Sequence, residues 1–157
     1  PIIAYNYGAG HKDRVIKTIK HSVAYGVGIM FVGLLAMHIF PAQLMRMFDA
    51  EESLIAIGAP ALETISLSFV FAGFCIVAGS VFQALGNGVY SMIVSVARQM
   101  CVLLPVAKLL SLSGEVTLIW WAFPIAELAS VLLTSYFLVR IYRKVICHIG
   151  EPVVQDA

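Results

Sequence analysis

The chain has 157 residues, of which 61% are hydrophobic and 12% charged, and its mean hydropathy is +0.93. A soluble domain is about 45–50% apolar and about 25% charged, so this composition excludes an ordinary soluble domain as well as a disordered chain. The formal net charge is +1 and no extended basic patch exists, so we do not expect nucleic acid as a partner. The three cysteines show no CxxC spacing, and the sequence therefore predicts neither a disulfide framework nor a metal site.

The first ten residues have the pattern of the end of a helix. Residues 1–7 are mostly apolar, and a Gly-Ala-Gly stop follows them at 8–10. The chain begins with Pro1 rather than Met and lacks a signal-peptide pattern, so we expect a fragment of a longer membrane protein. Apolar residues then recur at helical spacing over 15–23. They predict either a helix lying along the membrane surface or an extension of the first membrane span.

Long stretches with almost no charge follow. A bilayer core about 30 Å thick requires about 20 apolar residues at the helical rise. The stretch from residue 53 to residue 111 is divided by Gly86-Asn87-Gly88, a helix stop and turn signal. We therefore predict an all-α integral membrane protein with four spans, over residues 22–43, 62–85, 89–110 and 117–139, and a cytoplasmic tail over residues 140–157.

The basic residues predict the orientation. Of the ten lysines and arginines, seven flank the outer ends of the predicted bundle: Lys12, Arg14, Lys17, Lys20, Arg140, Arg143 and Lys144. Four spans return the chain to its starting side, so both clusters lie on one side. By the positive-inside rule that side is cytoplasmic, and the 44–53 loop is external.

Three ionisable residues, Glu63, Arg98 and Glu127, lie inside predicted spans. A charge there costs roughly 2.5–3.5 kcal/mol and usually faces a polar interior or a partner. Counted from the span ends at the helical rise, Arg98 lies about 13 Å deep and Glu127 about 15 Å deep. The two residues can therefore pair if their helices are neighbours. The alternative for Glu127 is a carboxylate that takes up a proton or cation during transport, whereas Glu63 is close enough to the outer surface to reach water.

Two prolines also lie inside predicted spans. Pro105 and Pro124 each remove a backbone donor and leave the carbonyl four residues earlier, of Cys101 and Trp120, without its helical partner. Broken helices at membrane depth are tolerated where they line a cavity, and they mark the binding regions of many secondary transporters. A passive kink is the alternative interpretation.

Small residues four positions apart predict where helices approach each other closely. The two pairs are Ala24 with Gly28 and Cys75 with Gly79. In most membrane proteins such pairs serve packing.

No enzyme signature is present. The sequence lacks HExxH, GxSxG and Walker motifs, and its four histidines are scattered. We therefore expect a protein that is not an enzyme and holds no cofactor and no metal.

The motifs resemble those of the multidrug and toxic compound extrusion (MATE) family. The segment PIIAYNYGAG at residues 1–10, followed by a basic loop, resembles the end of the eighth helix of that family; its matching positions are Pro1, Tyr5, Asn6, Tyr7, Gly8 and Gly10. The segment FQALGNG at 82–88, then ARQ at 97–99 and Pro105, resembles the tenth and eleventh helices. FPIAE at 123–127 resembles the twelfth.

The resemblance implies the last part of a twelve-helix fold, from the end of helix 8 to helix 12, in the cell membrane with a cytoplasmic C-terminus. It implies an antiporter that exports organic, often cationic compounds in exchange for sodium ions or protons by alternating access. The partners would be drug-like molecules, membrane lipid and the N-terminal lobe of the same protein. The candidates for the transport pathway or for coupling are Glu127, Arg98, Glu63, Gln83 and Pro124.

Two other functions stay open at this point. A flippase for lipid-linked saccharides belongs to the same superfamily, but it should carry a larger and more cationic cavity. A structural membrane subunit without transport is the third possibility, although two intramembrane prolines and two charges at mid-depth speak against a passive bundle.

Overall fold

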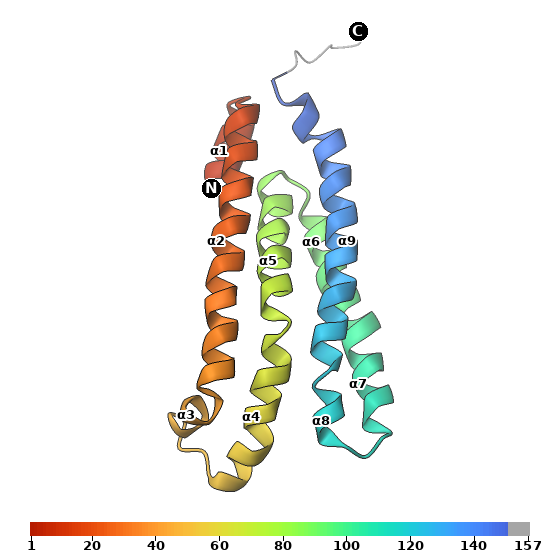
Figure 1. The fold of residues 1–157 in the computed structure, drawn as a ribbon. Coiled ribbons are helices and arrows are strands. Elements are labelled where there is room, and N and C mark those ends of the chain that lie inside the picture. The colour runs from red at the N-terminus through yellow and green to blue at the C-terminus, as the bar shows by residue number, and fades with distance from the viewer. Residues whose placement is uncertain (151–157) are drawn as a thin grey trace.

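The computed structural model describes residues 1–150, and every regular element in that range is a helix. Three helices are long and apolar enough to cross a membrane, and a bent pair adds a fourth if it is counted as one span. These rods lie side by side along one axis, with α1 and the last turns of α9 at the same end of the bundle (Figure 1). The fold is the helical membrane bundle expected from the composition.

The first rod is a single helix. The short α1 (Ile2–Gly8) is followed by a turn in which Gly10 has φ +72°, and α2 runs unbroken over Lys12–Ile39. Because α2 has no bend near residue 22, the basic segment extends the span rather than lying along the surface. The predicted span end at 43 is wrong, since Pro41 starts a separate helix, α3 (Pro41–Arg46). Proline has no N–H to continue the ladder of α2.

The second rod is bent. The helices α4 (Glu52–Ser66) and α5 (Phe69–Ala84) meet at an angle of 54°. At the bend the Ser68 hydroxyl donates to the carbonyl of Ile65 at 2.6 Å, which satisfies an acceptor where the helix ends. The rod begins ten residues before the predicted start at 62. The sequence predicted one straight span and therefore missed the first ten residues. Two helices joined by a bend can together be longer than one straight span.

The third rod changes its helical type in the middle. It consists of α6 (Gly88–Val96), the π-helix η1 (Ala97–Leu103) and α7 (Leu104–Ser111). Pro105 is the second residue of α7, just after the π-helix, and it cannot donate to the carbonyl of Cys101. The wider π turn accommodates this missing hydrogen bond without ending the rod.

The fourth rod is interrupted near its start. A short α8 (Val116–Ile119) precedes α9 (Ala122–Lys144), and the 3₁₀ turn η2 (Ile146–His148) ends it. Pro124 lies in the first turn of α9, where no intrahelical donor is required. The carbonyl of Trp120 accepts from the N–H of Phe123 at 3.3 Å instead.

The expected tail over 140–157 begins within a helix. Because α9 continues to Lys144, the basic residues Arg140, Arg143 and Lys144 are helical. Residues 151–157 of that tail lie outside the described residues.

The close approach of α2 to α5 depends on glycines other than those expected. A Cβ built on Gly26 would lie 2.6 Å from a methyl group of Val77, and one on Gly73 would lie 3.0 Å from the carbonyl oxygen of Gly26. At Gly28 a Cβ would meet nothing within 4 Å, and at Gly79 only the Ser91 hydroxyl at 3.2 Å. The four-residue spacing therefore identified small residues within one helix. It missed Gly26 and Gly73, which meet at the crossing and lie on different helices.

The best-packed part of the bundle is the end that holds α1 and η2. Its buried cluster combines residues from α1, α2, α5, α9 and η2, among them Val15, Phe82, Leu85, Ile141 and Ile146. Large apolar side chains such as Ile29 and Val32 of α2 stay mostly exposed. This arrangement, with apolar residues facing outward along the rods, is that of helices surrounded by lipid.

Candidate functional site

An ion pair between a partly exposed arginine and a buried glutamate joins the third and fourth rods. Arg98 of η1 donates from Nη1 to Oε2 of Glu127 on α9, at 3.1 Å. The Glu127 side chain is 6% exposed and that of Arg98 39% exposed. The sequence left open whether these charges meet, and the structure pairs them.

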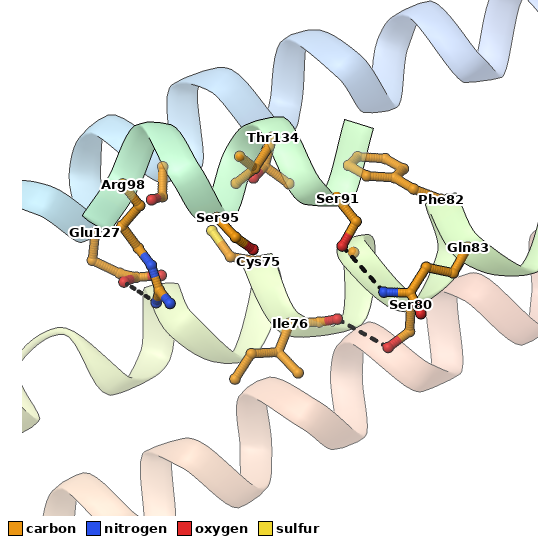
Figure 2. A pocket seen from close by; sticks show the side chains of 13 residues that line it. Cys75, Ile76, Ser80, Phe82, Gln83, Ser91, Ser95, Arg98, Glu127 and Thr134 are labelled. Carbon is orange, nitrogen blue, oxygen red and sulfur yellow. Dashed lines mark hydrogen bonds and ion pairs between the residues drawn. The ribbon is translucent and has the colours of Figure 1, made fainter. Parts of the chain in front are cut away.

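A cavity of about 210 Å³ extends from this pair toward the α5–α6 turn. We call it the polar cavity, because its wall contains serine, threonine, glutamine, cysteine and both charged side chains. Figure 2 shows Arg98 and Glu127 at one end and Gln83 with Ser91 at the other. The lining residues are Cys75, Ile76, Gly79, Ser80, Phe82, Gln83, Ser91, Val94, Ser95, Arg98, Glu127, Ser130 and Thr134.

A second cavity, of about 270 Å³, lies on the other side of the ion pair. We call it the bend cavity, because the three irregular parts of the backbone meet around it. Ser68 comes from the α4–α5 bend, Gln99 from the π-helix and Phe123 from the residues just after the α8–α9 break. Arg98 and Glu127 line both cavities, so their ion pair is the wall between them.

Three buried oxygens of α9 lack a hydrogen-bond partner among the described residues. They are Oε1 of Glu127, Oγ of Ser130 and Oγ1 of Thr134. Ser130 is 2% exposed and Thr134 is fully buried. The spacing of three and four residues places all three on one face of α9, and that face lines the polar cavity.

Gln83 lies at the rim of the polar cavity. Its amide nitrogen donates to the hydroxyl of Ser91 at 3.2 Å, which links α5 to α6 (Figure 2). Gln83 and Ser95 are exposed, whereas Glu127 and Thr134 are buried, so the cavity is open on the α5–α6 side and closed by α9.

The other predicted residues do not join this site. Glu63 is exposed on α4 and lines neither cavity. Pro124 is in the first turn of α9 beside the bend cavity, and its side chain does not line it. The structure thus unites Arg98, Glu127 and Gln83 and leaves Glu63 and Pro124 outside.

The positions that carried the family resemblance form the corner between α1 and α2. Asn6 is 7% exposed, and its side-chain amide donates to the carbonyl of Ile2 at 2.9 Å. Gly10 occupies the left-handed turn, where a side chain would be strained. Pro1, Tyr5, Tyr7 and Gly8 complete this corner, and none of these positions lines the polar cavity.

Sequence reasoning missed the hydroxyl residues of the site. Ser130 and Thr134 follow Glu127 at helical spacing within an apolar helix, so a count of polar residues on one face of α9 would have found them. Ser91 and Ser95 repeat at four-residue spacing on the facing rod. The sequence suggested only a packing role for Cys75, as a small residue four positions before Gly79, because nothing in the sequence places it beside α9.

Within residues 1–150, no group of three or more His, Cys, Asp and Glu side chains could hold a metal ion.

The family model MatE matches residues 1–109. The chain belongs to the MatE family. Members of the family are transporters rather than enzymes, so this is a MATE-type, multi-pass membrane transporter. No curated protein and no solved structure matches the chain. The matched region includes Arg98, whereas its partner Glu127 lies beyond it.

Proposed function

We propose that this MATE-type transporter exports organic, often cationic compounds in exchange for sodium ions or protons. The observation that carries the proposal is the ion pair of Arg98 and Glu127, which forms the wall between two cavities. A buried carboxylate with one paired and one unpaired oxygen can exchange its partner for an incoming cation. Buried charges of this kind usually mark ion pathways in membrane proteins.

The coupling step that we propose is a competition for Glu127. When a proton or sodium ion neutralises the carboxylate, its attraction for Arg98 falls, and the wall between the cavities loosens. Breaking a buried pair leaves an uncompensated charge and is unfavourable by several kcal/mol. The free energy of ion binding can therefore be converted into a change of shape at this wall.

The drug itself requires more room than either cavity offers. Pockets for drug-sized molecules have volumes of about 300–1,000 Å³, whereas the polar cavity has about 210 Å³ and the bend cavity about 270 Å³. A cavity of about 530 Å³ between α1, α2 and α5 is large enough, but neither Arg98 nor Glu127 lines it. We propose that the compound binds between this helical body and a second one, the N-terminal lobe that the family resemblance implies. Rocking of the two bodies gives alternating access.

The sidedness follows the charge distribution. We propose that the end of the bundle with α1 and η2 is cytoplasmic in the cell membrane, because it carries Lys12, Lys17 and Arg143. The polar cavity then lies in the cytoplasmic half. An impermeant thiol reagent added outside should label a cysteine placed at residue 50 and leave one at residue 13 unlabelled; the reverse would invert the topology.

The flippase alternative is less well supported. A site for a lipid phosphate requires free cationic groups, yet Arg98 is the one cation that lines either cavity, and Glu127 neutralises it. A paired arginine leaves little net positive charge for an anionic substrate.

The test compares two carboxylates in the complete protein as encoded. Glu127→Gln should lower drug efflux by at least about tenfold. Loss of the charge should weaken cation binding by at least about 1.4 kcal/mol, and that free energy corresponds to a tenfold change. Glu63→Gln is the matched control, because Glu63 is exposed and lines neither cavity, and it should leave efflux nearly unchanged.

Efflux of a fluorescent organic cation from energised membrane vesicles is the measurement, with both variants present at the same level in the membrane. Full efflux by the Glu127→Gln variant would contradict the proposal. An equal loss in both variants would show that the position of the charge is unimportant.

A further inference from the structure

The buried oxygens of α9 lack a hydrogen-bond partner of good geometry within the described residues, since only the Cys75 thiol, a weak donor, lies close to Thr134 and Glu127. An unsatisfied buried hydroxyl or carboxylate oxygen costs about 1–3 kcal/mol, and native proteins almost always satisfy such atoms with protein groups or ordered water. Oε1 of Glu127, Oγ of Ser130 and Oγ1 of Thr134 are all nine-tenths or more buried and face one cavity. A cavity that is polar and large enough fills with water.

We propose that the polar cavity is a water site, and that its water carries protons from the Gln83–Ser95 rim to Oε1 of Glu127. This inference deepens the proposed function, on which it rests for the role of Glu127, and it names the proton as the coupling ion. The water that satisfies Thr134 and Ser130 forms the inner part of the path, and the exposed side chains of Gln83 and Ser95 lie at its opening.

The proton step is simple in its chemistry. A hydronium ion in the cavity gives one proton to Oε1, so that an O–H bond forms on Glu127, one O–H bond of hydronium breaks and a water molecule remains. The carboxylic acid is then neutral, and Arg98 keeps its own charge. The titratable groups that face Glu127 in the two cavities are Arg98 of η1 and the Cys75 thiol of α5; the linings from α2, α4 and α6 add none.

The chemistry of the wall favours water and protons over a bare metal cation. Glu127 is already neutralised by Arg98, so the site offers little net negative charge to a sodium ion. Hydroxyl groups both donate and accept, which suits them to orienting water molecules. Glu127 and Thr134 are also about 10 Å apart along the helix axis at 1.5 Å per residue, too far for one ion to bind both.

Two native cysteines give a direct test for water. Cys75 lines the polar cavity, whereas Cys101 is exposed on η1 and does not line it. We would make two forms of the complete protein, each with one of these cysteines and with all others replaced by serine. Membrane vesicles would then be treated with 2-aminoethyl methanethiosulfonate. Thiols react as thiolates, which form readily only in contact with water.

The expected result is labelling of Cys75 at least about tenfold faster than labelling of Cys101, which is exposed in the middle of an apolar rod and lines neither cavity. Thr134→Val keeps the shape but removes a hydroxyl that holds water, so it should slow labelling of Cys75 severalfold. Thr117→Val is the matched control, because Thr117 is exposed on α8 and lines neither cavity. It should change nothing.

A Cys75 that reacts no faster than Cys101 would overturn the water site, whatever the transport activity. Labelling is measured without transport, so a fast Cys75 in a protein that exports nothing would overturn the proposed function and leave the water site standing. For the proton path, Thr134→Val should reduce proton-driven efflux severalfold while the Thr117→Val variant retains it. Unchanged efflux in Thr134→Val despite slower labelling would overturn the path.

Discussion

The two cavities on either side of the ion pair differ in what makes them. The polar cavity lies between regular stretches of α5, α6 and α9, and its character comes from side chains such as Ser130 and Thr134. The bend cavity is lined mainly by apolar side chains, and its character comes from the backbone, which is bent at α4–α5 and wound as a π-helix in η1.

This difference separates two tasks. Regular helices hold their side chains in fixed positions and suit a site that must satisfy specific polar atoms. Irregular backbone has fewer helical hydrogen bonds to break when it moves, and it is tolerated at membrane depth where it lines a cavity. We therefore expect substitutions at the ion pair to affect both cavities, and substitutions at a bend or a hydroxyl to affect one.

The largest effect is expected at the shared wall. Arg98→Ala leaves Glu127 buried without its partner, and the cost should be about 3 kcal/mol in unfolding free energy, at the lower end for buried pairs because Arg98 is partly exposed. The measurement is the thermal unfolding of the purified protein in detergent. Adding Glu127→Gln should restore much of the loss, since no buried charge then remains. If the double variant is as unstable as Arg98→Ala, the pair is not the source of the effect.

A smaller effect is expected at the crossing of α2 and α5, because α5 contributes residues to both cavities. Gly73 lies between Ala72, which lines the bend cavity, and Cys75, which lines the polar cavity. A methyl group at Gly73 would lie 3.0 Å from the backbone oxygen of Gly26 and must push the helices apart. Gly73→Ala should cost about 2 kcal/mol, as overpacking does, in the same thermal assay.

Gly28→Ala is the control for that substitution. A Cβ at Gly28 meets nothing within 4 Å, so this change should be neutral or should stabilise α2 slightly. Equal destabilisation by both substitutions would show that the crossing is not a close one.

The smallest effect is expected at the bend cavity. Pro105→Ala restores a backbone donor next to the π-helix and favours a regular helix in its place. We expect efflux to fall about threefold, which corresponds to about 0.7 kcal/mol, with little change in thermal stability. Pro60→Ala is the control, because Pro60 lies inside α4 and lines neither cavity. Efflux that is unchanged in Pro105→Ala would show that the π-helix does not contribute to movement.

The sequence by itself determined the class of the protein and the rough positions of its helices. Long apolar stretches have one solution in a bilayer, because backbone groups must be satisfied within each helix. The same reasoning singled out Arg98 and Glu127, since a charge inside such a stretch needs a partner. It also located Pro105 and Pro124 at irregular places, because a missing N–H is a local property of proline.

Only the tertiary structure decided which residues meet. The pairing of Arg98 with Glu127, the Gly26–Gly73 crossing and the joining of Cys75 to Thr134 in one cavity all depend on how separate rods are rotated and aligned. Helical periodicity specifies a face within one helix but not its neighbour, and in lipid the hydrophobic effect does not select one apolar face over another. The packing of small and polar side chains makes that choice, and it is settled by contacts between residues far apart in the sequence.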